Sequence, residues 1–97
     1  MPLKIVFMGT PEFSVPTLKK LIENNFRVLS VYTQPPKKSK RGLKINISPV
    51  EEFSKKNQLN LRNPSNLNSD EEFKILKELS PDLVVVVAYG QLIPKNF

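Results

Sequence analysis

Apolar segments and amphipathic segments alternate along the chain. Residues 3–8 and 83–88 are apolar almost throughout, which is typical of strands that are covered on both faces in a parallel sheet. Residues 26–33 predict another strand, and "LNL" from Leu59 predicts a short one between them and residues 83–88. The pattern therefore predicts four strands separated by three connections.

Each connection carries a helix signal. The first has apolar residues that share one helical face: Val15, Leu18, Leu21 and Ile22. Thr10 or Ser14 is available to cap this helix. "SPVE" from Ser48 and "SDEE" from Ser69 are capping boxes that predict two further helices, the first of them running to about Lys56.

The alternation of strands and helices predicts an open parallel α/β sheet with helices on both faces, like the first half of a doubly wound sheet. Right-handed crossovers place the first and fourth strands side by side at its centre. The fourth strand begins at Leu83, ends at Ala88 and is expected to be buried on both faces. Since the sequence stops soon afterwards, we expect residues 1–97 to form one incomplete domain that self-associates through this strand when isolated.

The positive charge is concentrated in one segment. The net charge is +6, and residues 24–50 contain six basic residues and no acidic one. Five of them lie in "QPPKKSKRGLK", at residues 34–44, which the cap at Ser48 limits to a loop within the domain: Lys37, Lys38, Lys40, Arg41 and Lys44. Composition alone leaves open a solvated linker, a nuclear-localisation-like run and a grip on nucleic-acid phosphates.

The residue inventory excludes several chemistries. Without His or Cys, the chain has no Ser-His-Asp triad, no cysteine nucleophile and no usual zinc site, and we expect no metal. Gly9 belongs to neither a dinucleotide fingerprint nor a P-loop. The acidic clusters at residues 51–52 and 70–72 lie in first helical turns, where acids favour the helix dipole, so we interpret them as structural. The cysteine-free sequence has no signal peptide or bilayer-length apolar run, and we expect a cytoplasmic protein.

Ligands of open α/β sheets bind at the carboxyl ends of the strands. Here these ends are residues 9–13, the loop after Thr33 and residues 88–94. For "AYGQLIP", a ligand-binding role and a plain turn that plugs the core remain equally open.

Three segments together resemble a known family. "KIVFMGTPEFSVPTLKKL", "VYTQPPKKSKRGLKINISPV" and "SPDLVVVVAYGQLIP" are similar, in order and spacing, to the amino-terminal part of the methionyl-tRNA formyltransferases. The similarity covers nearly the whole chain. It implies a Rossmann-like catalytic domain, truncated after the fourth strand, and transfer of a formyl group from 10-formyltetrahydrofolate to the amino group of methionyl initiator tRNA in translation initiation.

The resemblance also implies roles for individual residues. The residues implied to contact tRNA are Arg41, Lys37, Lys38, Lys40 and Lys44. Those implied to bind folate are Tyr89, Gly90, Gln91, Leu92 and Ile93, with Tyr89 and Gly90 shaping the turn. The residues implied to shape the acceptor side of the cleft are Gly9, Thr10 and Pro11.

The family's catalytic Asn, His and Asp are expected beyond residue 97. The resemblance therefore implies no catalytic residue in this chain and no activity of the chain alone. Two alternatives remain open: a fragment of a sugar-nucleotide formyltransferase, and a stand-alone small RNA-binding α/β module.

Overall fold

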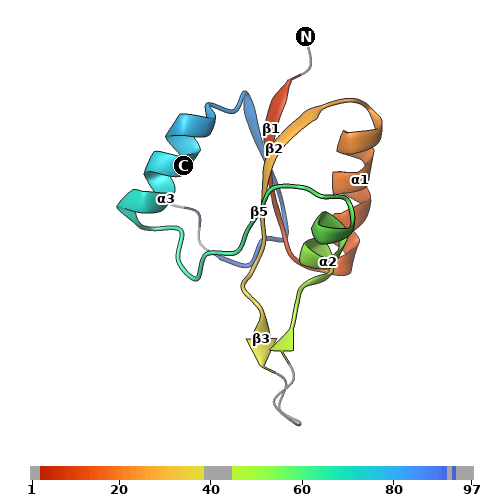
Figure 1. The fold of residues 1–97 in the computed structure, drawn as a ribbon, viewed down its shortest axis with the longest axis vertical. Coiled ribbons are helices and arrows are strands. Elements are labelled where there is room, and N and C mark those ends of the chain that lie inside the picture. The colour runs from red at the N-terminus through yellow and green to blue at the C-terminus, as the bar shows by residue number, and fades with distance from the viewer. Residues whose placement is uncertain (1–2, 39–44, 92, 94–97) are drawn as a thin grey trace.

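A four-stranded parallel sheet forms the centre of the protein. The computed structural model describes residues 3–38, 45–91 and 93. The strands lie in the order β5-β2-β1-β6, so β1 is central and adjacent to β6, as expected (Figure 1). Their bounds are β1 (Lys4–Gly9), β2 (Arg27–Tyr32), β5 (Leu61–Arg62) and β6 (Leu83–Val87).

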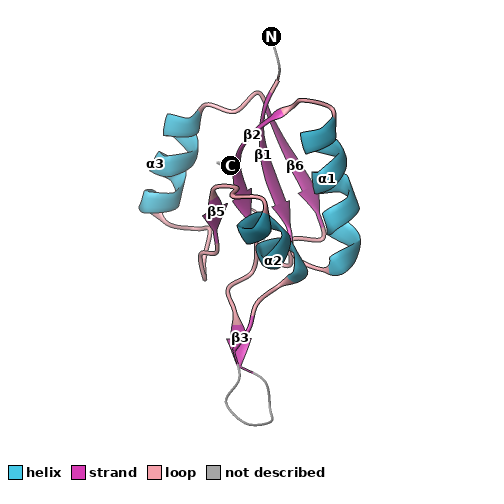
Figure 2. Ribbon diagram, turned by 45° about the vertical axis from the view of Figure 1, so that its right-hand side comes forward, coloured by secondary structure: helices cyan, strands magenta, loops and turns pink. Residues whose placement is uncertain are grey.

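Helices cover both faces of the sheet. Figure 2 shows α1 and α2 on one face and α3 on the other. Their bounds are α1 (Val15–Glu23), which follows the short 3-10 helix η1 (Glu12–Ser14), α2 (Pro49–Lys56) and α3 (Asp70–Leu79). The predicted α/β class is confirmed. None of the helices in the described part of the chain has the length and apolar character needed to cross a bilayer.

Strand β1 divides the core into two halves. Because side chains alternate along a strand, Val6 and Met8 face α3, whereas Phe7 faces α1 and α2. The α3 side also contains Tyr32, Leu67, Leu76 and Tyr89, and the opposite side contains Leu18, Val31 and Val50. Every residue from Ile5 to Gly9 is buried, which confirms that this apolar segment is a strand covered on both faces.

Strand β6 is not buried on both faces, contrary to the expectation from its sequence. It lies at the edge of the sheet with β1 as its partner. Val85 and Val87 pack on the α1 side, but Leu83, Val84 and Val86 are 50%, 36% and 45% exposed. The physical reason is that these three side chains belong to neither core cluster of the described residues, at an edge where no described strand continues the sheet.

The capping boxes start their helices where expected, but the first helix starts differently. Ser48 Oγ accepts a hydrogen bond from Glu51 N at 3.0 Å, and Ser69 Oγ accepts one from Glu72 N at 3.2 Å. Ser14 occupies the N-cap position of α1, but neither its hydroxyl nor that of Thr10 makes the predicted capping hydrogen bond. Their hydroxyls instead donate to backbone carbonyls at the end of β6, so they join two segments that are distant in sequence.

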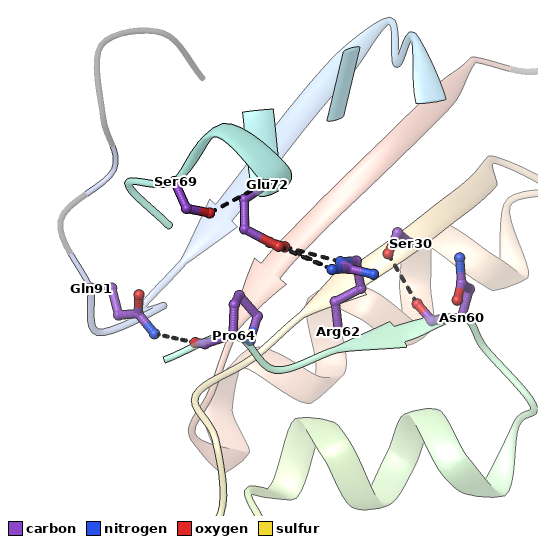
Figure 3. Close-up of polar contacts among 7 residues, drawn as sticks. All are labelled: Ser30, Asn60, Arg62, Pro64, Ser69, Glu72 and Gln91. Carbon is purple, nitrogen blue, oxygen red and sulfur yellow. Dashed lines mark hydrogen bonds and ion pairs between the residues drawn. The ribbon is translucent and has the colours of Figure 1, made fainter. Parts of the chain in front are cut away.

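Glu72 anchors helix α3 to the sheet. Its carboxylate, with the residue only 4% exposed, receives three hydrogen bonds of 2.9–3.1 Å from the guanidinium of Arg62 on β5 (Figure 3). Glu51 is also buried, and it accepts a hydrogen bond from Asn63 Nδ2 and pairs with Lys55. Both acids therefore have structural partners beyond the helix dipole.

Removing the charge of Glu72 should destabilise the protein, because it leaves the Arg62 guanidinium partly buried without a counter-ion. We expect Glu72→Gln to lower the free energy of unfolding by about 2–4 kcal/mol, measured by urea denaturation. Glu71→Gln, one residue away on the exposed side of the same helical turn, is the matched control and should stay within about 0.5 kcal/mol of the wild type. Equal effects of the two substitutions would contradict a stabilising role for the ion pair.

Candidate functional site

Three loops meet at the carboxyl ends of the central strands. Thr10 follows β1, Gln34 follows β2, and residues 89–91 follow β6. Hydrogen bonds of Thr10 and Gln34 join all three loops. The parallel arrangement thus brings the predicted strand ends together at one edge.

Thr10 is the centre of this junction. Its Oγ1 donates to the carbonyl oxygen of Tyr89 at 2.6 Å and accepts from the backbone N–H of Gln34 at 3.2 Å. Its own carbonyl oxygen accepts from Val50 N at 3.4 Å. A residue expected on the acceptor side of the cleft therefore also holds the segment expected to bind folate.

Gln91 continues the junction to a fourth loop. Its Nε2 donates to Gln34 Oε1 at 2.9 Å. The same nitrogen donates to the carbonyl oxygen of Pro64, also at 2.9 Å (Figure 3). Gly90 immediately precedes Gln91 and has φ of +98°, a conformation that glycine adopts readily. A Cβ atom at Gly90 would lie 2.6 Å from Gln34 Nε2, so the glycine makes room for the glutamine side chain.

Gln34 was not among the site residues predicted from the sequence, although it lies in one of the three segments that carry the resemblance. Its position just after β2 indicated a possible site residue, because ligands of open α/β sheets bind at the carboxyl ends of the strands. Its partners were not predictable, because they depend on how the turn at Gly90 directs Gln91.

The other residues assigned to the acceptor side shape the backbone after β1. A Cβ atom at Gly9 would lie 2.8 Å from Phe7 Cε2 and 2.9 Å from the carbonyl oxygen of Val87. Only glycine therefore allows this close approach to β6. Pro11 leads into η1, and its carbonyl oxygen accepts from Ser14 N at 3.0 Å.

The basic segment, predicted to be a loop because of the cap at Ser48, is flanked by the two short paired strands of a hairpin. Strands β3 (Lys37–Lys38) and β4 (Ile45–Asn46) pair antiparallel, with Lys37 opposite Asn46. The antiparallel pairing of β3 with β4 forms although the lysines and prolines of this segment disfavour strands. Figure 2 shows that the hairpin extends away from the body of the protein, beyond the carboxyl ends of the strands. Lys40, Arg41 and Lys44, and also Leu92, lie outside the described residues.

A pocket of about 280 Å³ lies where the hairpin joins the sheet. Its lining combines polar side chains, two prolines, one isoleucine and one lysine: Thr10, Gln34, Pro35, Lys37, Asn46, Ile47, Ser48 and Pro49. A larger hollow of about 360 Å³ between η1 and α2 has Glu12 and Phe53 in its wall, but it contains none of the residues that the resemblance implicates. We therefore regard the pocket beside Gln34 as the candidate site.

Tyr89 supports the turn from inside the core. Its residue is 2% exposed and packs in the α3-side cluster, and its hydroxyl has no hydrogen-bond partner among the described residues. Burial raises the pKa of Tyr89 to about 12, with smaller contributions from Glu72 and Tyr32. Burial also raises the pKa of Tyr32. This placement fits the expectation that Tyr89 shapes the turn.

The described residues hold no cluster of three or more His, Cys, Asp or Glu side chains that could bind a metal. The two buried carboxylates, Glu51 and Glu72, are already engaged by Lys55 and Arg62. The described part of the edge therefore offers hydroxyl, amide and backbone groups, which suit binding and orientation of a ligand.

The raised pKa of Tyr89 predicts a loss of stability at alkaline pH. Above about pH 10 the unfolded chain releases the phenolic proton while the folded chain retains it, so the unfolding free energy falls as the pH rises towards 12. Tyr89→Phe should remove roughly 2–3 kcal/mol of this loss and change stability at pH 8 by at most about 1 kcal/mol. Urea denaturation of both proteins at pH 8 and at alkaline pH measures the unfolding free energies. An alkaline loss of stability that Tyr89→Phe leaves unchanged would refute the assignment of this loss to Tyr89.

Comparison with known proteins identifies the family. Residues 3–97 match the family model described as "Formyl transferase". The methionyl-tRNA formyltransferase of Pelagibacter ubique (strain HTCC1062) is 54% identical over 98 residues, which cover 100% of this chain and 32% of the relative. The corresponding proteins of Coxiella burnetii (strain RSA 331 / Henzerling II) and Clostridium novyi (strain NT) are 50% and 49% identical, over 99% and 97% of this chain and 31% and 30% of their own length.

The chain thus spans about a third of the length of these curated relatives. The fold and the matched residues agree with the resemblance found in the sequence. The chain belongs to the formyl transferase family.

Proposed function

We propose that this chain forms the substrate-holding part of a methionyl-tRNA formyltransferase. In this role the basic hairpin binds the initiator methionyl-tRNA, and residues 89–93 bind 10-formyltetrahydrofolate. The names of the relatives support this reaction. The observation that carries the proposal is that the hairpin and the turn are joined at one edge of the sheet through Thr10 and Gln34.

The hairpin suits a nucleic-acid backbone. Its segment carries five basic residues and no acid, and paired strands hold both of its ends next to the carboxyl edge. Lysines supply attraction that releases counter-ions from RNA, and the planar guanidinium of Arg41 adds a directional contact to phosphate. We propose that the end of the bound RNA strand lies at the pocket at the base of the hairpin.

The turn after β6 suits the folate co-substrate. Gly90 is exposed and Ile93 is 39% exposed, so both are accessible to a ligand. A pterin ring carries hydrogen-bond donors and acceptors together with flat apolar faces, which backbone groups and an aliphatic side chain can match. Gln91 is bound to Gln34 and Pro64 and therefore contributes by fixing the path of this turn.

The described residues supply little for the proton transfers of the reaction. The chain has no histidine, and its buried carboxylates are engaged elsewhere. We therefore propose that groups outside this chain manage the proton of the attacking amine and stabilise the developing oxyanion. The exposed edge of β6 offers a place for a further strand or a second copy to pair, and self-association there stays a prediction.

The phosphate grip is tested in the full-length natural protein that carries this sequence. Arg41→Ala should weaken binding of initiator methionyl-tRNA and leave folate binding unchanged. If Arg41 and two lysines each neutralise one phosphate, log K should fall with log salt at a slope of about −3, and the substitution should make the slope shallower by about one.

Lys74→Ala is the matched control, because Lys74 is an exposed basic residue on α3, away from the hairpin. It should leave both the affinity and the slope close to those of the wild type. If the affinity of the wild-type protein for tRNA did not change with salt concentration, the proposal that the hairpin binds phosphates would be refuted. A formyltransferase acting on sugar nucleotides would be insensitive to Arg41→Ala.

We also expect the 97-residue chain by itself to give no formyl transfer from 10-formyltetrahydrofolate to methionyl-tRNA, because it has no histidine to act as a base near neutral pH. Single-turnover assays with radiolabelled methionyl-tRNA at high protein concentration measure this. Formylation that rises in proportion to the concentration of purified chain would show that it contains a sufficient set of catalytic groups.

A further inference from the structure

A continuous hydrogen-bonded bridge joins the hairpin to the turn after β6. The backbone N–H of Gln34 donates to Thr10 Oγ1, and Gln34 Oε1 accepts from Gln91 Nε2. Gln91 Nε2 also donates to the carbonyl oxygen of Pro64. Thr10 Oγ1 binds the carbonyl oxygen of Tyr89 from the other side. The turn is therefore held at both Tyr89 and Gln91 by residues of the two neighbouring loops.

The connection between Gln34 and the hairpin is short and stiff. Two residues, Pro35 and Pro36, separate Gln34 from Lys37, where β3 begins. Proline fixes its own φ, and it restricts the preceding residue to extended conformations. The two prolines therefore limit how far β3 can move independently of Gln34.

The contact between Gln34 and the turn is equally close. The side-chain amide of Gln34 lies over Gly90, where even a Cβ atom would collide with it, and Gln34 Oε1 accepts the hydrogen bond from Gln91. Gln34 cannot change its position without altering the surroundings of Gly90 or breaking the bond to Gln91. The position of the hairpin and the geometry of the turn are thus linked by one side chain.

We propose that Gln34 is a positioning residue that couples the RNA-binding hairpin to the folate-binding turn, so that each ligand strengthens binding of the other. This inference rests on the proposed function, which assigns the two ligands to these two segments. Both ligands favour the bridged arrangement, in which Gln34 is bound to Gln91. Coupling between two binding equilibria is reciprocal, so the same factor must appear in both affinities.

The test measures binding of two probes to the full-length natural protein that carries this sequence. The probes are 5-formyltetrahydrofolate, which cannot donate its formyl group in this reaction, and an RNA hairpin that reproduces an initiator acceptor stem. For the wild-type protein we expect saturating RNA to lower the Kd of the folate by about fivefold or more, and saturating folate to lower the Kd of the RNA by the same factor.

Two substitutions of Gln34 separate coupling from general stability. Gln34→Met keeps the length of the side chain but cannot accept the bond from Gln91, and it should reduce the coupling factor to about one while both probes still bind. Gln34→Glu keeps an acceptor oxygen and should retain the coupling. Thr10→Val should also weaken coupling, whereas Thr17→Val on helix α1 is its matched control and should leave it unchanged.

The outcomes are distinguishable. Full coupling in Gln34→Met, or independent binding of the two probes to the wild-type protein, would overturn the positioning role while leaving the proposed function intact. Failure of the wild-type protein to bind either probe would overturn the proposed function, and this inference with it. If Gln34→Met does not fold, Gln91→Met removes the same hydrogen bond from the opposite side, together with the bond to Pro64, and should give the same loss of coupling.

Discussion

The parallel pairing of β1 with a neighbour on each side determines the rest of the architecture. β1 pairs with β2 through residues 4–8 and with β6 through residues 5–9, and all three strands run in the same direction. Their following loops must therefore emerge at one edge of the sheet. Because β1 is buried on both faces, it also separates the core into the half beneath α3 and the half beneath α1 and α2. The candidate site exists because these constraints bring Thr10, Gln34 and Gln91 into contact.

The sequence was most informative where a local pattern determines a local structure. The apolar run at residues 3–8 predicted β1, and the serines at 48 and 69 predicted the starts of α2 and α3. It was less informative where a side chain can choose between a near and a distant partner. The hydroxyls of Thr10 and Ser14 are chemically suited to cap a helix, but the end of β6 supplies carbonyl oxygens at 2.6 and 2.7 Å.

The same distinction applies to the site. The rule for open α/β sheets predicted a site at the edge where Thr10, Gln34 and Gln91 meet, and the resemblance selected residues within it. The bridge through Gln34 depends on a left-handed turn and on two side-chain amides that are distant in sequence, so no pattern of spacing reveals it. Burial of Glu72 against Arg62 likewise depends on where α3 lies over β5. The apolar sequence of β6 predicted cover on both faces, but whether its side chains are covered depends on which elements pack over them.

The pairing of β1 with β6 also has a kinetic consequence. The contact between Lys4 and Asp82 spans 78 positions of the chain, so the central strand acquires its second neighbour only after almost all of the described sequence is available. Contacts of such long range slow folding, because the entropy of closing the loop is lost before the contact is gained. During synthesis, β1 and β2 can associate early with α1, while Val6 and Met8 still lack much of their cover. The junction at Thr10 is then assembled last, since its partner Tyr89 is among the final described residues to emerge.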